Sequence, residues 1–198
     1  MYPSGVTECM VRPLVAAVAV PFAMVALAVG VGPPTNATDA TELDGCTTID
    51  ESGTYHLTAD VENGGGTAIS KACFRITADD VTFDGNGHAI DGRGVSHTKG
   101  VTVARSENVT LQNFTATDWH AGVRVENGSA TIRDVASFSN AYGVRLEAAG
   151  GSALVDTAID DNLVGVIKTS ENVSMKNNSI GGNEISIREI NRSRSASE

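Results

Sequence analysis

A short motif, in which a glycine or serine opens an apolar strand, recurs through the second half of the chain. The first four copies begin at Gly100, Gly122, Gly143 and Gly165, and a fifth begins at Ser186. The successive spacings are therefore 22, 21, 22 and 21 residues. A period in this range with a strand in every unit is typical of a solenoid, whose units bury their apolar surface against their neighbours.

A second series of short strands runs through the same repeats. It begins at Val81 and returns at Val109, Ala130, Ala153 and Val173. Its first interval is 28 residues, and the excess falls within residues 86–99, where we expect a loop to leave the coil. The mature sequence shows no helical period, which excludes helical solenoids. We therefore predict an all-β parallel β-helix of about five to six coils over residues 46–190.

The N-terminal residues differ in kind from the repeats. Arg12 precedes a run over residues 14–32 that carries no charge, and Ala26-Leu27-Ala28 offers small residues for cleavage. We interpret residues 1–32 as a signal peptide, with an uncleaved N-terminal anchor as the alternative. A polar linker over residues 33–45 and a polar tail over residues 191–198 complete the predicted organisation. Export predicts a secreted or cell-surface protein that contacts a membrane only through an uncleaved N-terminal segment.

The charge of the chain limits the kinds of partner that it can be expected to bind. The formal net charge is -10, the chain has four lysines, and its acidic residues are spread along its length. We expect no polybasic face and therefore no nucleic-acid partner, because phosphate binding needs clustered Lys or Arg. The acidic excess favours solubility and fits a halophilic, exported protein.

Three cysteines are present, and two of them follow the leader. Cys9 lies within the predicted export segment, which leaves Cys46 and Cys73. An even pair in an exported chain predicts a disulfide, because no His or Cys stands at metal-ligand spacing beside either residue. We expect no metal and no cofactor. The closed loop contributes about 3 kcal/mol in the chain-entropy model.

Asparagines recur in two patterns. Asn140, Asn162 and Asn183 each stand three residues before the glycine or serine of a repeat, which predicts a ladder whose amides bond from coil to coil and which can accept a left-handed backbone. Seven other asparagines precede Thr or Ser by two residues and are candidates for glycosylation: Asn36, Asn108, Asn113, Asn127, Asn172, Asn177 and Asn191.

Two further motifs carry a resemblance to a known family. They are the segments 52–58 (SGTYHLT) and 80–92 (DVTFDGNGHAIDG), which lead into the coils. From about Cys46 to Ile190 the chain resembles the right-handed parallel β-helix proteins of the pectin-lyase-like superfamily, above all short exported β-helix proteins of archaeal cell surfaces. It is also similar in fold to NosD-like accessory proteins of copper-enzyme maturation. The resemblance implies a right-handed β-helix and says almost nothing about activity.

Catalytic groups of that superfamily are not evident in the sequence. Asp160 and Asp161 form the one adjacent acidic pair of the late coils, but no Gly-His-Gly or Arg-Ile-Lys motif follows them. Paired carboxylates are what a glycosidase needs, and a lyase would need an arginine beside calcium-binding aspartates. Arg124 and Arg145 stack one coil apart, each with a glutamate two residues beyond, which predicts an ion-pair ladder.

Aromatic and basic residues gather at one rim of the coils. Trp119 and His120 precede Arg124, and Tyr142 with Arg145 falls one coil on. Exposed aromatic rings offer flat faces for sugar stacking, with arginines in reach of acidic groups. These five residues form the candidate ligand site. For Trp119 itself the sequence favours the other interpretation, in which it covers a coil junction where one extra residue must be accommodated.

The sequence therefore favours an exported, non-catalytic β-helix module of the cell surface or envelope. Its expected partner is a surface glycan or an envelope protein. A structural or adhesive role is a second form of the same hypothesis. The first alternative is a lyase or hydrolase of acidic polysaccharide, and the second is a NosD-like accessory protein.

Overall fold

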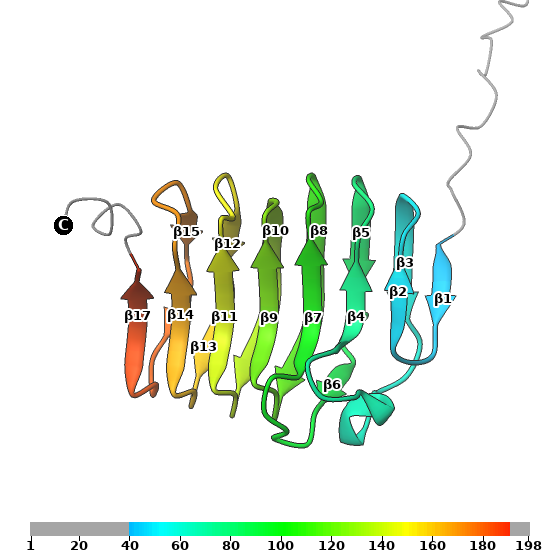
Figure 1. The fold of residues 1–198 in the computed structure, drawn as a ribbon, viewed down its shortest axis with the longest axis horizontal. Helices are drawn as coiled ribbons and strands as arrows, with labels where there is room; N and C mark the ends of the chain where they lie inside the picture. The colour runs from blue at the N-terminus through cyan, green and yellow to red at the C-terminus, as the bar shows by residue number, and fades with distance from the viewer. Residues whose placement is uncertain (1–39, 191–198) are drawn as a thin grey trace, which may run out of the picture. The chain divides into compact units, whose positions relative to one another are not determined.

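The computed structural model describes residues 40–190, and these residues form the predicted parallel β-helix. Two long parallel sheets run along it, with successive turns side by side (Figure 1). The 7-stranded sheet contains β2 (Thr47–Ile49), β4 (Ala72–Ile76), β7 (Lys99–Ala104), β9 (Ala121–Glu126), β11 (Tyr142–Glu147), β14 (Val164–Lys168) and β17 (Ile185–Glu189).

The 10-stranded sheet takes the remaining strands of each turn. Its members are β1 (Thr41–Leu43), β3 (Gly53–Leu57), β5 (Val81–Asp84), β6 (Ala89–Asp91), β8 (Val109–Thr117), β10 (Ala130–Phe138), β12 (Ala153–Val155), β13 (Ala158–Asp160), β15 (Ser174–Lys176) and β16 (Ser179–Ile180). A short 3-10 turn, η1 (Asn63–Gly66), connects β3 to β4. Parallel pairing from turn to turn explains why the motif period appears in the sequence.

The core lies between the two sheets and is filled by aliphatic side chains. Val123 pairs in register with Val144, and Val144 with Val166, so equivalent residues of successive turns stack. All three are fully buried. Towards the N-terminal turns the core is aromatic, since the Phe83 ring centroid lies 4.9 Å from that of Phe74 and 5.6 Å from that of Phe114.

The β-helix begins earlier than the sequence predicted. β1 lies inside the segment 33–45 that was predicted as a linker, and Thr41 to Leu43 pair with Tyr55 to Leu57 of β3. Only Leu43 of this short strand is buried, so its Thr-Glu-Leu sequence looks like polar linker. The predicted export segment 1–32 and the tail 191–198 lie outside the described residues. Within residues 40–190, no helix is long and apolar enough to span a bilayer.

The predicted disulfide is present. Cys46 lies just before β2 and Cys73 lies in β4, and their sulfur atoms are bonded with a Cα–Cα distance of 4.4 Å. Because β2 pairs with β4, the bond joins two adjacent turns near the N-terminal end. It therefore ties β2, which lies at the end of the 7-stranded sheet and pairs there with β4 alone, to the next turn.

The asparagine ladder is also present. The Asn140 side-chain amide donates to Asn162 Oδ1 at 3.1 Å, and that of Asn162 donates to Asn183 Oδ1 at 2.9 Å. The backbone expectation was wrong, because the left-handed residues are those directly before the ladder: Ser139, Asp161 and Gly182, with φ of 56°, 52° and 57°. That turn directs each amide inward, where it bonds to the next.

Candidate functional site

The outer face of the 7-stranded sheet carries a row of basic side chains. Arg75 pairs in register with Thr102, Thr102 with Arg124, and Arg124 with Arg145. Glu126 and Glu147 form the neighbouring row, because they too are register partners. One turn of a β-helix brings residues 21 to 27 positions apart in sequence to adjacent strands, which the strand spacing places about 4.8 Å apart.

The arginines and glutamates form the ion-pair ladder that the sequence predicted. An Arg124 Nη atom lies 2.8 Å from Glu126 and 2.6 Å from Glu147, while Arg145 lies 2.7 Å from Glu147. Burial alone would raise the pKa of Glu147, but hydrogen bonds from Arg145 and Arg124 outweigh it and lower that pKa. Glu147 is therefore held as a carboxylate that fixes both guanidinium groups.

The expectation that the chain has no polybasic face was wrong. Lys71, Arg75, Lys99, Arg124 and Arg145 lie close together on the 7-stranded sheet, and we call this set the cationic face. Burial lowers the pKa of Lys99, and the positive charge of Arg124 lowers it further. The sequence hides this cluster because its five members come from four different turns.

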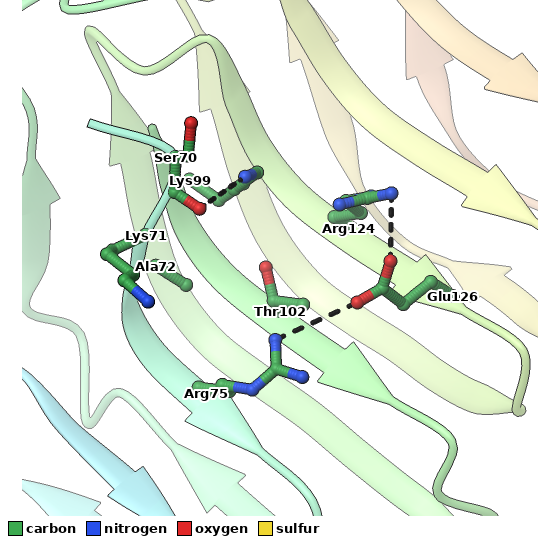
Figure 2. A pocket seen from close by; sticks show the side chains of 8 residues that line it. All are labelled: Ser70, Lys71, Ala72, Arg75, Lys99, Thr102, Arg124 and Glu126. Atoms are coloured by element: carbon green, nitrogen blue, oxygen red, sulfur yellow. Dashed lines mark hydrogen bonds and ion pairs between the residues drawn. The ribbon is translucent and has the colours of Figure 1, made fainter. Parts of the chain in front are cut away.

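Two adjoining grooves lie on the cationic face and share Lys99 and Arg124. The larger, the Thr102 groove, has a volume of about 410 Å³ and is drawn in Figure 2; its lining residues are Ser70, Lys71, Ala72, Arg75, Lys99, Thr102, Arg124 and Glu126. The smaller, the His120 groove, has a volume of about 160 Å³ and is lined by His97, Lys99, His120, Ala121, Arg124 and Arg145.

Three rings meet at the rim of the His120 groove. His97 stacks on His120 with centroids 5.1 Å apart, and His120 meets Tyr142 edge-on at 5.3 Å. The Arg145 guanidinium lies 5.2 Å from the centre of the Tyr142 ring, so Tyr142 supports the arginine. Burial lowers the pKa of His120, and electrostatic interactions with the neighbouring His97, Arg145 and Lys99 lower it further.

Trp119 does not belong to this surface, and its predicted role as a stacking face was wrong. The side chain is 2% exposed, and its indole Nε1 donates to the Ile90 carbonyl at 2.8 Å. Gly92 and Gly100 lie against the ring, where an added Cβ would be 2.9 Å and 3.1 Å from indole atoms. Trp119 therefore covers the junction where the loop over residues 92–98 leaves the coil, which is the interpretation that the sequence favoured for it. The other four predicted ligand residues lie around the His120 groove.

The remaining predicted residues lie on other surfaces. Asp160 ends β13 and Asp161 has a left-handed φ of 52°, so this acidic pair belongs to a turn. Five glycosylation candidates are exposed, and Asn36 and Asn191 lie outside the described residues; the five are Asn108, Asn113, Asn127, Asn172 and Asn177.

Sequence reasoning missed Lys71, Arg75, Lys99, Thr102 and His97. One signal was available for Thr102, which stands two residues after Gly100 as Arg124 and Arg145 stand two after their own glycines. Arg75 had no such marker, because Cys73 occupies the place of the glycine. The two lysines and His97 lie in or beside loops that do not follow the repeat.

The relationships of the chain agree with this fold. A family model described as periplasmic copper-binding protein (NosD) matches residues 38–197, which include the whole described β-helix. The chain belongs to the NosD family. In a separate comparison with individual proteins, the chain is 34% identical over 103 residues to the probable outer membrane protein pmp11 of Chlamydia pneumoniae. That alignment covers 48% of this chain and 10% of the relative. No solved structure gives a significant match.

Proposed function

We propose that this NosD-family protein is an exported, non-catalytic β-helix protein of the cell envelope that binds acidic carbohydrate on its cationic face. The family description is periplasmic and the relative is a probable outer membrane protein, and both support a location in the envelope or at the cell surface. A polysaccharide with carboxylate or sulfate groups is a polyanion, which is the charge that a cationic face attracts.

The observation that carries the proposal is the gathering of cations on an otherwise acidic chain. The formal net charge is -10, yet five of the 14 lysines and arginines lie on the cationic face. Repulsion among clustered cations costs free energy, which a bound polyanion would offset. The surrounding acidic surface also repels polyanions elsewhere and so directs them to this face.

The His120 groove supplies the specific contacts. Arg145 Nε is buried and has no hydrogen-bond partner among the described residues, so it is a free donor beside the groove. Tyr142 and Glu147 hold the guanidinium of this arginine, which limits the conformational entropy lost on binding. The exposed His97 and half-buried His120 add ring edges and donors against which a sugar can lie.

A glycan array with acidic, sulfated and neutral polysaccharides tests this proposal, with Arg145→Gln as the main variant. We expect binding to uronate or sulfate polymers only, and about tenfold weaker binding by the variant, because a charge-assisted contact is lost. The matched control is Arg133→Gln, which removes an arginine from the 10-stranded sheet. Equal binding of neutral glycans, or binding of single-stranded RNA without any glycan, would overturn the proposal. A protein that binds no polyanion would instead have the structural role.

The enzymatic alternative is decided in the same samples. A lyase acting on these polymers would release unsaturated uronates, and a hydrolase would release reducing sugars. We expect neither product from the wild-type protein over long incubation. Release of either one, abolished by Lys99→Gln or Arg124→Gln, would show that the cationic face is catalytic.

Copper is implied by the family description, and the described residues do not fit it. Within residues 40–190, no three His, Cys, Asp or Glu side chains are grouped so that they could hold a metal ion. Cys46 and Cys73 are joined in the disulfide. The stacked His97 and His120 lie beside Lys99 and Arg145, whose positive charges oppose a cation. Metal analysis of the purified protein is expected to find no stoichiometric copper, and stoichiometric copper would contradict this assignment.

A further inference from the structure

The floor of the Thr102 groove contains a polar group that the fold leaves unpaired. Thr102 is 1% exposed, and its hydroxyl has no hydrogen-bond partner among the described residues. An unpaired buried hydroxyl costs free energy, so native proteins contain few of them and each calls for an explanation. Figure 2 shows this hydroxyl between the side chains of Lys99, Arg75 and Arg124.

The other buried hydroxyls of the described residues all have hydrogen-bond partners, so the missing partner is specific to Thr102. The Thr98 hydroxyl donates to the Val95 carbonyl at 2.6 Å, and that of Ser137 donates to the Gly143 carbonyl at 2.9 Å. The remaining buried hydroxyls of residues 40–190 are bonded as well; they belong to Ser106, Ser152 and Thr157. Thr102 alone among them faces a groove and lacks a partner.

Positive charges outnumber negative charges around this hydroxyl. Four cations, Lys71, Arg75, Lys99 and Arg124, line the groove with one carboxylate, Glu126. Glu126 lies 2.8 Å from Arg124 but 3.7 Å from Arg75, so its contact with Arg75 is weak. Within residues 40–190, neither lysine forms an ion pair, although Lys99 Nζ donates to the Ser70 carbonyl at 3.0 Å. The groove therefore has room and charge for one more anion.

From these observations we propose that the Thr102 groove is a subsite for a single oxyanion, the carboxylate or sulfate of one sugar residue. One oxygen of the anion accepts a hydrogen bond from the Thr102 hydroxyl, and Arg75 and Lys99 bind the remaining oxygens of the anion. The assignment to a sugar rests on the proposed function, whereas the anion chemistry rests on the groove alone. Because Lys99 and Arg124 also line the His120 groove, one acidic chain running across the strands would contact both grooves.

Amide NMR titrations with sodium sulfate, glucuronate and phosphate at constant ionic strength test the subsite. We expect saturable shifts in β4, β7 and β9, and affinity about tenfold lower for Thr102→Val, the loss typical of one hydrogen bond to a charged group. Because valine removes an unpaired hydroxyl without changing the shape of the residue, the variant should melt at the same or a higher temperature. Thr131→Val, on the outer face of β10, is the matched control and should bind like wild type.

The results separate this subsite from the proposed function. Shifts that do not saturate, or equal affinity in the wild type and Thr102→Val, would overturn the subsite even if acidic glycans bind. Sulfate or glucuronate binding that survives in Arg145→Gln, while glycan binding falls, would support the subsite and the proposed function together. Binding of phosphate with no measurable binding of glucuronate or sulfate would overturn the assignment to a sugar.

Discussion

Replacing Asn162 with leucine tests how the turns are held together. Asn162 is 3% exposed; its Oδ1 accepts the Asn140 backbone N–H at 2.9 Å, and its Nδ2 donates to the carbonyls of Ser137 and Asp160 at 2.9 Å and 2.8 Å. Leucine has a similar size but makes none of these bonds. One buried N–H left unpaired costs about 1–3 kcal/mol, and each lost bond contributes roughly 0.5–1.5 kcal/mol. We therefore expect the free energy of unfolding to fall by about 3 kcal/mol.

Thermal and urea unfolding of the variant measure this loss. For a domain of this size, 3 kcal/mol corresponds to a decrease in Tm of roughly 6–12 °C. Asn172→Leu is the matched control, because Asn172 is exposed, and it should change Tm little. Anion and glycan binding by the folded Asn162→Leu protein should be unchanged, because the ladder does not line either groove. An unchanged Tm in this variant would refute the reasoning that the amide ladder stabilises the turns.

Three further outcomes follow from the structure. Trp119→Ala should lower the free energy of unfolding by about 3–5 kcal/mol through the emptied coil junction, measured by urea unfolding, and should leave glycan affinity intact; lost binding with unchanged stability would contradict this. Replacing both Cys46 and Cys73 with alanine should cost about 3 kcal/mol, with hydrogen exchange rising first in β2 and β4, and uniform exchange would contradict it. Burial and nearby cations lower the pKa of folded His120, so the unfolded state binds more protons and the stability that this residue contributes is present above about pH 6.5 and is lost as the pH falls through the lower folded value. The difference in unfolding free energy between wild type and His120→Gln should therefore change only between that lower value and about pH 6.5, with the wild type losing stability as the pH falls; a constant difference at every pH would refute it.

The repeating part of the fold could be predicted from the sequence because each turn repeats the same physical problem. A glycine or serine near the start of a strand recurs with the turn length in five repeats, and an asparagine three residues earlier recurs in the last three of them. The disulfide was predicted from a separate signal, the even pair of cysteines in a chain expected to be exported. β1 was missed because only Leu43 in it is buried, and a three-residue strand with one inward side chain has no detectable alternation.

The site was harder to predict because its residues belong to different turns. Arg124 and Arg145 carried the repeat signal, and their pairing with Glu126 and Glu147 followed from the alignment of two turns. Lys71 and Lys99 lie in or beside loops, so no period connects them to the arginines. Trp119 was included in the candidate ligand site although the junction role was favoured, because an aromatic residue at a turn looks the same in sequence whether it covers the core or faces solvent.

Mapping the bound polysaccharide on the protein tests the central claim most directly. Amide NMR or hydroxyl-radical footprinting with a polyuronate chain should show protection on β7, β9 and β11, centred on Arg124. The same experiment at high salt should show the protection lost, because the contacts are electrostatic. Protection on β8, β10 and β12 instead, or protection that persists at high salt, would contradict the assignment of the cationic face as the binding surface.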